Sequence, residues 1–180
     1  VVYQDDVLGN SGSQFGLGDT TPTLFFSPKE PTRGGLIWGV GPVFLLPTAT
    51  DELLGGEKWG IGPSVVMLKQ TTAGLTYGIL ANHIWSVAGD DDRADISNTF
   101  LQPFVSKALG KGRTITFNTE SSYNWEDSQW TVPLNLQYTV VKRWGKHLVS
   151  IGGGGRVFLE TPDGGPDWGL RLIVTLLYPR

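Results

Sequence analysis

The chain has 180 residues, enough for one domain that encloses a single core or lumen, and its lack of cysteine excludes a disulfide framework or a thiolate metal site. Its net charge of −3 argues against a nucleic-acid-binding surface. No apolar run approaches the roughly 20 residues that a membrane helix needs. The longest candidate, residues 36–46, contains Gly39, Gly41 and Pro42, which are poor helix formers. If the protein lies in a membrane, β-structure must carry it across.

Nine segments have the pattern of strands, and Gly, Pro, Asp and Asn residues separate them. The alternation is clearest in the seventh segment, where Leu134, Leu136 and Tyr138 share one face and Asn135 and Gln137 share the other. We therefore expect an all-β domain. In chain order the nine expected strands are 15–26, 36–46, 59–67, 75–87, 96–106, 114–125, 130–141, 148–160 and 170–178.

Ionised side chains are nearly absent from these segments and fall in the connections between them. Residues 34–50, 70–89 and 128–141 contain no Lys, Arg, Asp or Glu. A soluble β-protein normally places ionised side chains along the water-facing side of its strands. Strands whose ends reach water and whose middles lie at the depth of a bilayer have the pattern found here. The sequence therefore predicts an antiparallel, up-and-down transmembrane β-barrel.

The connections alternate in the sign of their charge along the chain. Lysine and arginine gather in every second connection, whereas aspartate and glutamate gather in the others. Because alternate connections of a meander lie at the same end, we expect one basic rim and one acidic rim, the latter extracellular. The acidic run at residues 90–95 lacks the spacing of an EF-hand loop, so no metal site is predicted there. The acidic rim comprises Asp51, Glu52, Asp90, Asp91, Asp92, Asp95, Glu126 and Asp127.

Tryptophan and tyrosine residues fall at the ends of the expected strands. The motif Trp-Gly-aliphatic-Gly-Pro occurs at residues 38–42 and 59–63, and on adjacent antiparallel strands its two tryptophans lie at opposite ends. Aromatic belts of this kind mark the two lipid–water interfaces of a barrel, whereas the alternative is a sandwich core. The expected girdle residues are Trp38, Trp59, Trp85, Trp125, Trp130 and Tyr178.

Charged and amide side chains on the polar faces are the candidate lumen residues. Arg156 and Arg171 lie on neighbouring expected strands, and Glu120 and Glu160 are placed to pair with them. One interpretation is a constriction that selects solutes by charge and size. The alternative is an ion-pair network that plugs a small barrel. The full set is Asn118, Glu120, Asn135, Gln137, Arg156, Glu160 and Arg171.

Two other motifs suggest chemistry but have simpler structural interpretations. The glycines at residues 152–155 are followed by a strand pattern rather than by Lys-Ser/Thr and a helix, so they do not form a phosphate loop. His83 lies on an apolar face near Trp85, with Ser97 and Thr99 expected across the hairpin. That arrangement resembles the catalytic set of outer-membrane phospholipases, and a histidine within the aromatic girdle is the alternative.

Several segments resemble one known family: 25–31, 41–48, 59–63, 80–86, 99–104 and 174–179. It is the outer-membrane family named for the MetA pathway of phenol degradation, whose members often carry the label transporter or, misleadingly, neuromedin U. The resemblance implies a Gram-negative outer-membrane β-barrel of about twelve strands. Because nine strands are expected here and residues 1–3 have the pattern of a strand end, we expect further strands before Val1.

These observations predict a single domain over residues 1–180 in the bacterial outer membrane. The leading hypothesis is a passive channel for small solutes, including hydrophobic or aromatic ones, with no catalytic residues and no cofactor. Membrane lipids, lipopolysaccharide and the solute are its expected partners, and nucleic acid is not. The second hypothesis is a scaffold barrel without an open pore, associated with other envelope proteins. The third is an outer-membrane lipase that uses His83.

Overall fold

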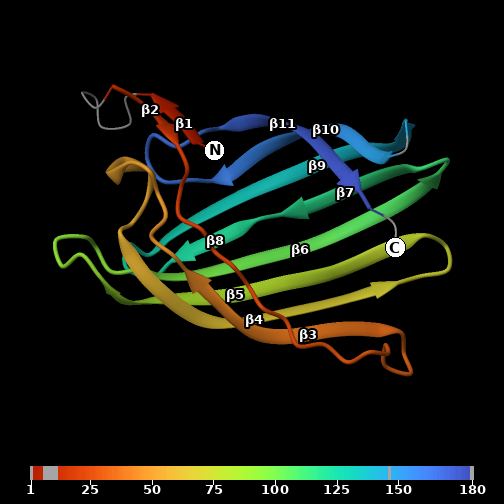
Figure 1. Cartoon of the computed structure of the whole chain (residues 1–180), viewed down its shortest axis with the longest axis horizontal. Coiled ribbons are helices and arrows are strands. Elements are labelled where there is room, and N and C mark those ends of the chain that lie inside the picture. The colour runs from red at the N-terminus through yellow and green to blue at the C-terminus, as the bar shows by residue number, and fades with distance from the viewer. Residues whose placement is uncertain (1, 6–11, 146, 179–180) are drawn as a thin grey trace.

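The computed structural model describes residues 2–5, 12–145 and 147–178 and contains one long antiparallel sheet (Figure 1). Within these residues no helix is long and apolar enough to cross a membrane. The elements are β1 (Val2–Asp5), β2 (Ser13–Gly16), β3 (Leu36–Leu45), the 3-10 turn η1 (Glu52–Leu54), β4 (Lys58–Gln70), β5 (Leu75–Gly89), β6 (Ser97–Gly110), β7 (Arg113–Thr119), β8 (Ser121–Asn124), β9 (Gln129–Trp144), β10 (His147–Glu160) and β11 (Trp168–Leu177).

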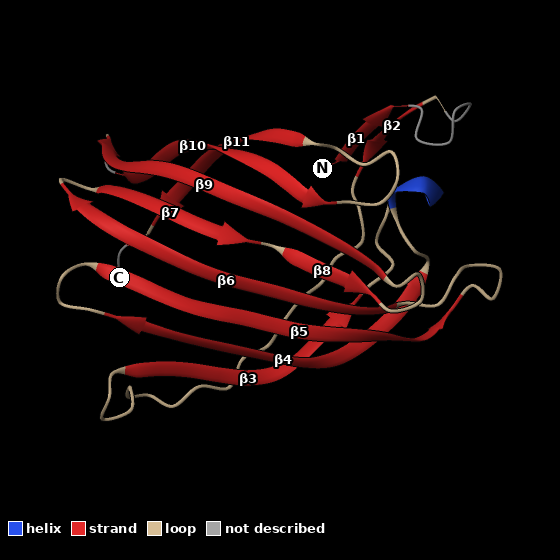
Figure 2. Ribbon diagram, turned by 180° about the vertical axis from the view of Figure 1, so that it is seen from behind, coloured by secondary structure: helices blue, strands red, loops and turns tan. Residues whose placement is uncertain are grey.

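The sheet is an up-and-down meander of nine strands, β3 to β11, in which each strand pairs with its neighbours in the chain. Strands β7 and β8 keep one register against both β6 and β9, so they act as a single strand interrupted at Glu120. The all-β, antiparallel prediction is confirmed, and eight of the nine expected segments lie within a few residues of observed strands. Both ribbon views show long strands side by side in a curved sheet (Figure 2).

The two edges of the sheet differ. Strand β11 pairs only with β10 among the described residues, whereas β3 receives a further partner from residues 20–26. That segment forms isolated antiparallel bridges at Thr20, Thr23 and Phe26. The predicted continuous strand over 15–26 is therefore wrong, because its first residues belong to β2 and pair with β1 instead. Pro22, which has no backbone N–H to donate, interrupts the ladder in the remainder.

The registers place every second side chain on one of two faces, which we call inner and outer. Across the inner face Ser64 lies opposite Asn82, which in turn lies opposite Phe100. The outer face carries the alternate positions, such as Leu136 and Leu170, which flank Gly155 of β10. Most of the large exposed apolar side chains of β3 to β11 lie on this outer face, and the buried polar side chains lie mainly on the inner one.

The repeated Trp-Gly-aliphatic-Gly-Pro motif directs tryptophan outward and glycine inward. On β3 the two inward glycines let the 20–26 segment approach, because a Cβ on Gly41 would overlap the carbonyl oxygen of Leu24. On β4 Gly60 leaves room for side chains of the flanking strands, since a Cβ there would meet Leu45 at 3.1 Å and Ile84 at 2.7 Å. The glycines thus allow close packing on the inner face.

Replacing Gly41 with Ala should push residues 20–26 away from β3 and destabilise the protein by about 1–3 kcal/mol, the usual penalty of overpacking. The matched control is Gly155→Ala, because a Cβ at Gly155 has no neighbour within 4 Å. Denaturant unfolding followed by tryptophan fluorescence measures both variants. Equal stability of the two would show that the close approach at Gly41 does not constrain the fold.

Candidate functional site

Three charged side chains meet on the inner face, on the side of the sheet formed by β7 to β11. Glu120 occupies the break between β7 and β8, while Arg156 projects from β10 and Arg171 from β11. Arg171 binds the carboxylate through two nitrogens, with Nη1 2.9 Å from Oε1 and Nη2 2.8 Å from Oε2. Arg156 also donates to Oε2 of Glu120. We call this arrangement, in which two arginines bind one glutamate, the Glu120 cluster.

Amide side chains of the neighbouring strands support the Glu120 cluster. Arg156 Nε donates to Asn135 Oδ1 at 2.6 Å, and Asn135 Nδ2 donates to the backbone carbonyl of Asn118 at 3.4 Å. Both asparagines are buried, and the guanidinium of Arg156 lies 5.7 Å from the centre of the Phe158 ring. Asn135 thus fixes the orientation of Arg156, since a carboxamide oxygen accepts the Nε–H that the carboxylate leaves unused.

The Glu120 cluster has more positive than negative charge. One carboxylate faces two guanidinium groups, and each of the three side chains keeps between 23 and 34% of its surface exposed. A net positive charge at a partly hydrated inner surface attracts anions and repels cations that pass beside it. The cluster can therefore discriminate between solutes by charge, and it needs no metal or cofactor to do so.

The sequence predicts two further residues in this site, Glu160 and Gln137, and neither of them bonds to the Glu120 cluster. Glu160 does not join the cluster, because a bulge between Phe158 and Glu160 shifts the register and places Glu160 opposite Val132, an outer-face residue. Its expected pairing with arginine is therefore wrong. Gln137 does lie on the inner face, opposite Gly154, but no side-chain hydrogen bond joins it to the cluster. A prediction based on the two-residue alternation of side chains along a strand cannot detect a bulge.

The acidic residues gather at the end of the sheet where β4 begins and β5 ends. Arg93, in the β5–β6 connection, ties this end together: it donates to the carbonyl oxygens of Glu52 and Gly55 and forms a 3.2 Å ion pair with Glu57. One arginine therefore joins two loops. Sequence reasoning could not detect this contact, because the partners of Arg93 are backbone carbonyls 38 and 41 residues away.

Three of the predicted acidic rim carboxylates accept hydrogen bonds from residues close in the chain. Asp51 accepts from the backbone N–H of Leu53 at 2.9 Å and so caps η1, and Asp90 accepts from that of Asp92 at 2.8 Å. In the β8–β9 turn, Asp127 accepts from the Asn124 side chain at 2.6 Å. No group of three or more metal-binding side chains occurs in the part of the chain that the structure describes.

Asp95 differs from the other rim carboxylates because a lysine binds it. Lys58 Nζ lies 3.2 Å from Asp95 Oδ1, and Ser86 donates to the same oxygen at 3.1 Å. These two hydrogen bonds, that of Lys58 first, hold the pKa of Asp95 below its usual value. The contact joins the start of β4 to the end of the β5–β6 connection. It also gives the buried Lys58 side chain a counter-charge.

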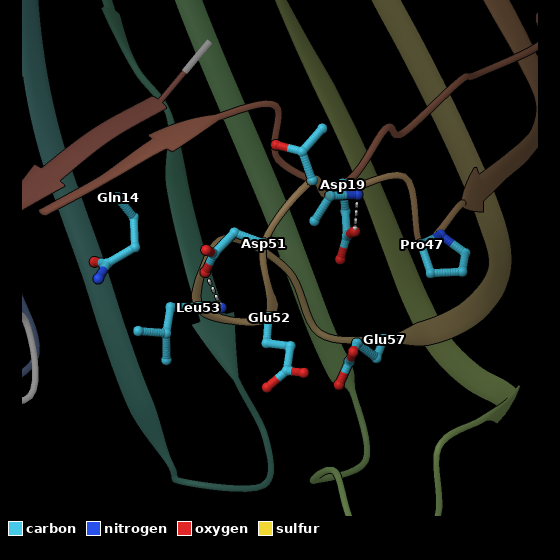
Figure 3. Close-up of a pocket in the computed structure, with 9 residues that line it drawn as sticks. Gln14, Asp19, Pro47, Asp51, Glu52, Leu53 and Glu57 are labelled. Atoms are coloured by element: carbon cyan, nitrogen blue, oxygen red, sulfur yellow. Dashed lines mark hydrogen bonds between the residues drawn. The ribbon is translucent and has the colours of Figure 1, made fainter. Parts of the chain in front are cut away.

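A cavity of about 770 Å³ opens at this acidic end (Figure 3). We call it the acidic vestibule. Asp19 accepts hydrogen bonds from two backbone N–H groups of the β3–β4 connection, those of Ala49 at 3.1 Å and Gly56 at 2.7 Å. The sequence pattern does not identify Asp19 as a site residue, because both of its partners lie 30 or more positions away in the chain. The vestibule is lined by Gln14, Asp19, Pro47, Ala49, Thr50, Asp51, Glu52, Leu53 and Glu57.

A second cavity of about 350 Å³ lies on the inner face and shares Asp19 with the vestibule. We call it the inner pocket. Its wall combines apolar side chains, among them Ile84 and Phe100, with the carboxamides of Asn82 and Asn98. The sequence pattern does not identify this pocket, whose wall includes Thr21 and Thr23 of the segment beside β3. The remaining lining residues are Val43, Leu45 and Ile96.

Aromatic side chains lie at both ends of the outer face. Near the acidic end they form a continuous cluster, in which Tyr123 lies 4.9 Å from Trp125 and 4.8 Å from Trp130 between ring centres. Trp59 and Trp85, at the same end, are about half exposed. The predicted girdle residues at the opposite end are Trp38, near the start of β3, and Tyr178, just after β11.

His83 belongs to this aromatic cluster. Its ring lies 4.1 Å from that of Trp85, and its Nδ1 is 2.7 Å from Thr99 Oγ1. Thr99 also accepts a hydrogen bond from Trp125 Nε1 at 2.9 Å. The expected neighbour across the hairpin is therefore present, but it is a threonine. Ser97 instead lies opposite Trp85. The contacts of Thr99 link two aromatic residues of the outer face.

Searches with this chain against protein-family models, curated proteins and solved structures returned no significant match.

Replacing Glu120 with Gln should leave two guanidinium groups without their counter-charge. We expect the free energy of unfolding to fall by about 1–3 kcal/mol, less than for a fully buried pair because all three side chains keep contact with solvent. Denaturant unfolding measures the change, and the double variant with Arg171→Gln should recover part of it.

The matched control is Glu160→Gln, which removes a carboxylate from the outer side of the bulge, with an expected change within about 0.5 kcal/mol. If the Glu160 variant lost as much stability as the Glu120 variant, the assignment of the ion pairs to Glu120 alone would be wrong.

Proposed function

We propose that this chain forms the wall of an outer-membrane β-barrel that acts as a passive channel for small solutes. One observation carries the proposal: the two faces have the opposite of the polarity expected in water. Leu170 and Leu172 of β11 expose more than 80% of their surface, whereas Asn135 on the inner face exposes 1%. In a bilayer such an outer face contacts hydrocarbon, and the inner face encloses polar groups.

Strand length and side-chain distribution support the same proposal. Strands β4, β5, β6, β9 and β10 have between 13 and 16 residues, more than the 9–11 or so that a tilted strand needs to cross a bilayer. The aromatic side chains at the two ends of the outer face suit the lipid–water interfaces. The family resemblance of the sequence points to the same membrane.

Membrane insertion places a strict demand on the two edges of the sheet. Lipid offers no hydrogen-bond partner, so the free backbone groups of β11 and of the 20–26 segment must pair with other strands before the sheet can span a bilayer. The proposed barrel is therefore larger than the nine-stranded sheet. Additional strands complete the wall that this sheet begins.

The inner face supports conduction of small solutes. Its β3–β6 half is rich in apolar side chains such as Leu80 and Phe104, whereas its β7–β11 half carries the Glu120 cluster and its supporting amides. A passage with one apolar and one polar wall suits small amphipathic molecules, because apolar and polar groups of the solute both find partners. Lipid and lipopolysaccharide surround the outer face in this proposal.

Placing a charge on the outer face distinguishes a membrane barrel from a soluble sheet. Leu136, about half exposed in the middle of β9, would contact hydrocarbon, so Leu136→Arg should cost about 2–4 kcal/mol in lipid vesicles. On the surface of a soluble protein, arginine at this position would be almost neutral. Urea unfolding from vesicles measures the difference.

The matched control places the same residue on the inner face. Gln102 lies opposite Leu80 there, and Gln102→Arg should cost less than about 1 kcal/mol because its side chain reaches water in the lumen. A Leu136 variant as stable as the wild type in lipid would refute the membrane assignment.

Conductance in planar bilayers tests the channel itself. We expect steady single-channel currents from the wild type. Glu120→Gln should raise the preference for anions, because it removes the only carboxylate of the Glu120 cluster and keeps both arginines. Reversal potentials under a salt gradient measure this preference. A wild type that inserts but carries no current would favour the scaffold hypothesis over the channel.

A further inference from the structure

We infer that the inner pocket and Asp19 together form a binding site for small organic cations, in which an ammonium group is attached to an apolar or aromatic body. This inference rests on the proposed channel, because it names the class of solute that the channel takes at its acidic end. The pocket volume of about 350 Å³ is at the lower limit of small-molecule sites, which fits a ligand with a single ring.

The apolar part of the pocket comes from three elements that meet on the inner face. Val43 and Leu45 project from β3, Ile84 from β5 and Phe100 from β6. Strand β4 lies between β3 and β5 but places only glycine there, at Gly60 and Gly62, so no side chain of β4 fills the space. The result is an apolar surface that an aromatic or aliphatic body of a ligand can cover.

Four polar side chains line the same pocket. The carboxamides of Asn82 and Asn98 project from β5 and β6, and Thr21 and Thr23 come from the segment that crosses the pocket. None of these four side chains has a hydrogen-bond partner within the described residues. Each offers an oxygen that can accept a hydrogen bond from an ammonium group, so the pocket supplies acceptors close to its apolar wall.

Asp19 supplies the charge. Its two carboxylate oxygens each accept one backbone N–H, and no cation of the described residues pairs with it. This distinguishes it from Glu57, which pairs with Arg93, and from Asp95, which pairs with Lys58. Asp19 is half-buried and lies where the vestibule and the inner pocket meet. Its negative charge is held by two hydrogen bonds and has no counter-ion among the residues that the structure describes.

The surroundings favour a cation over an anion at this position. A ligand that reaches the pocket from the acidic end passes Asp51 and Glu52 before it meets Asp19. The negative charge of these carboxylates repels an anion and attracts a cation. The arginines of the Glu120 cluster project from β10 and β11, and neither strand contributes to the inner pocket.

Three ligands of one shape test the charge preference on the unaltered protein. Benzylamine, benzyl alcohol and benzoate share a single ring and differ in charge at pH 7. Isothermal titration calorimetry on the complete barrel in lipid nanodiscs should show benzylamine binding at least about tenfold more tightly than benzyl alcohol, because a charge-assisted hydrogen bond adds to the same apolar contact. Benzoate should bind most weakly. Equal affinities, or tighter binding of benzoate, would overturn the inference.

Variants then locate the site. Asp19→Asn should reduce benzylamine affinity about tenfold and leave that of benzyl alcohol unchanged, and Phe100→Ala should weaken both ligands. The matched control is Glu52→Gln, an acid of the vestibule outside the inner pocket, which should change benzylamine affinity less than about twofold. If Glu52→Gln weakened benzylamine binding as much as Asp19→Asn, the preference for a cation would come from the acidic rim as a whole. The assignment of the site to Asp19 and the inner pocket would then be wrong.

Calorimetry also separates this inference from the proposed channel. Selective benzylamine binding by a protein that carries no current would sustain the site and refute the channel. Steady currents without any preference among the three ligands would sustain the channel and refute the site.

Discussion

The alternation of side chains across a β-strand is the constraint on which the rest of this structure depends. Because successive residues face opposite sides, each strand presents one set of side chains to the outer face and another set to the inner face. In this sheet most of the large exposed apolar side chains face outward, whereas most of the buried polar side chains face inward. The Glu120 cluster follows from this division: charged groups that lie partly buried on the inner face pair with one another and with amides such as Asn135. The aromatic side chains at both ends of the outer face also follow from this division, and in the proposed barrel they would meet the two lipid–water interfaces.

Much of this arrangement could be predicted from the sequence, and the failures have physical causes. Strand positions and the pairing of Glu120 with Arg156 and Arg171 follow from alternation, which needs only local sequence. Glu160 was misplaced because a one-residue bulge reverses the faces beyond it and leaves no mark in the pattern. Asp19 was missed because its role comes from contacts with residues 30 and 37 positions away.

Charge is divided along the sheet as well as across it. At one end carboxylates surround the vestibule, while the middle of the inner face carries the excess positive charge of the Glu120 cluster. A solute that crosses the proposed channel therefore meets opposite potentials in succession. Such a sequence slows the passage of any ion with a single sign and favours molecules in which apolar surface supplies part of the binding energy.

The loops at the acidic end form one mechanical unit through Arg93. Arg93 belongs to the β5–β6 connection, and its side chain contacts two carbonyl oxygens and one carboxylate of the β3–β4 connection. These contacts couple the positions of the two loops. Asp19 attaches the N-terminal segment to the same connection. The contacts of Arg93 and Asp19 thus couple three segments that are far apart in the chain at the mouth of the vestibule.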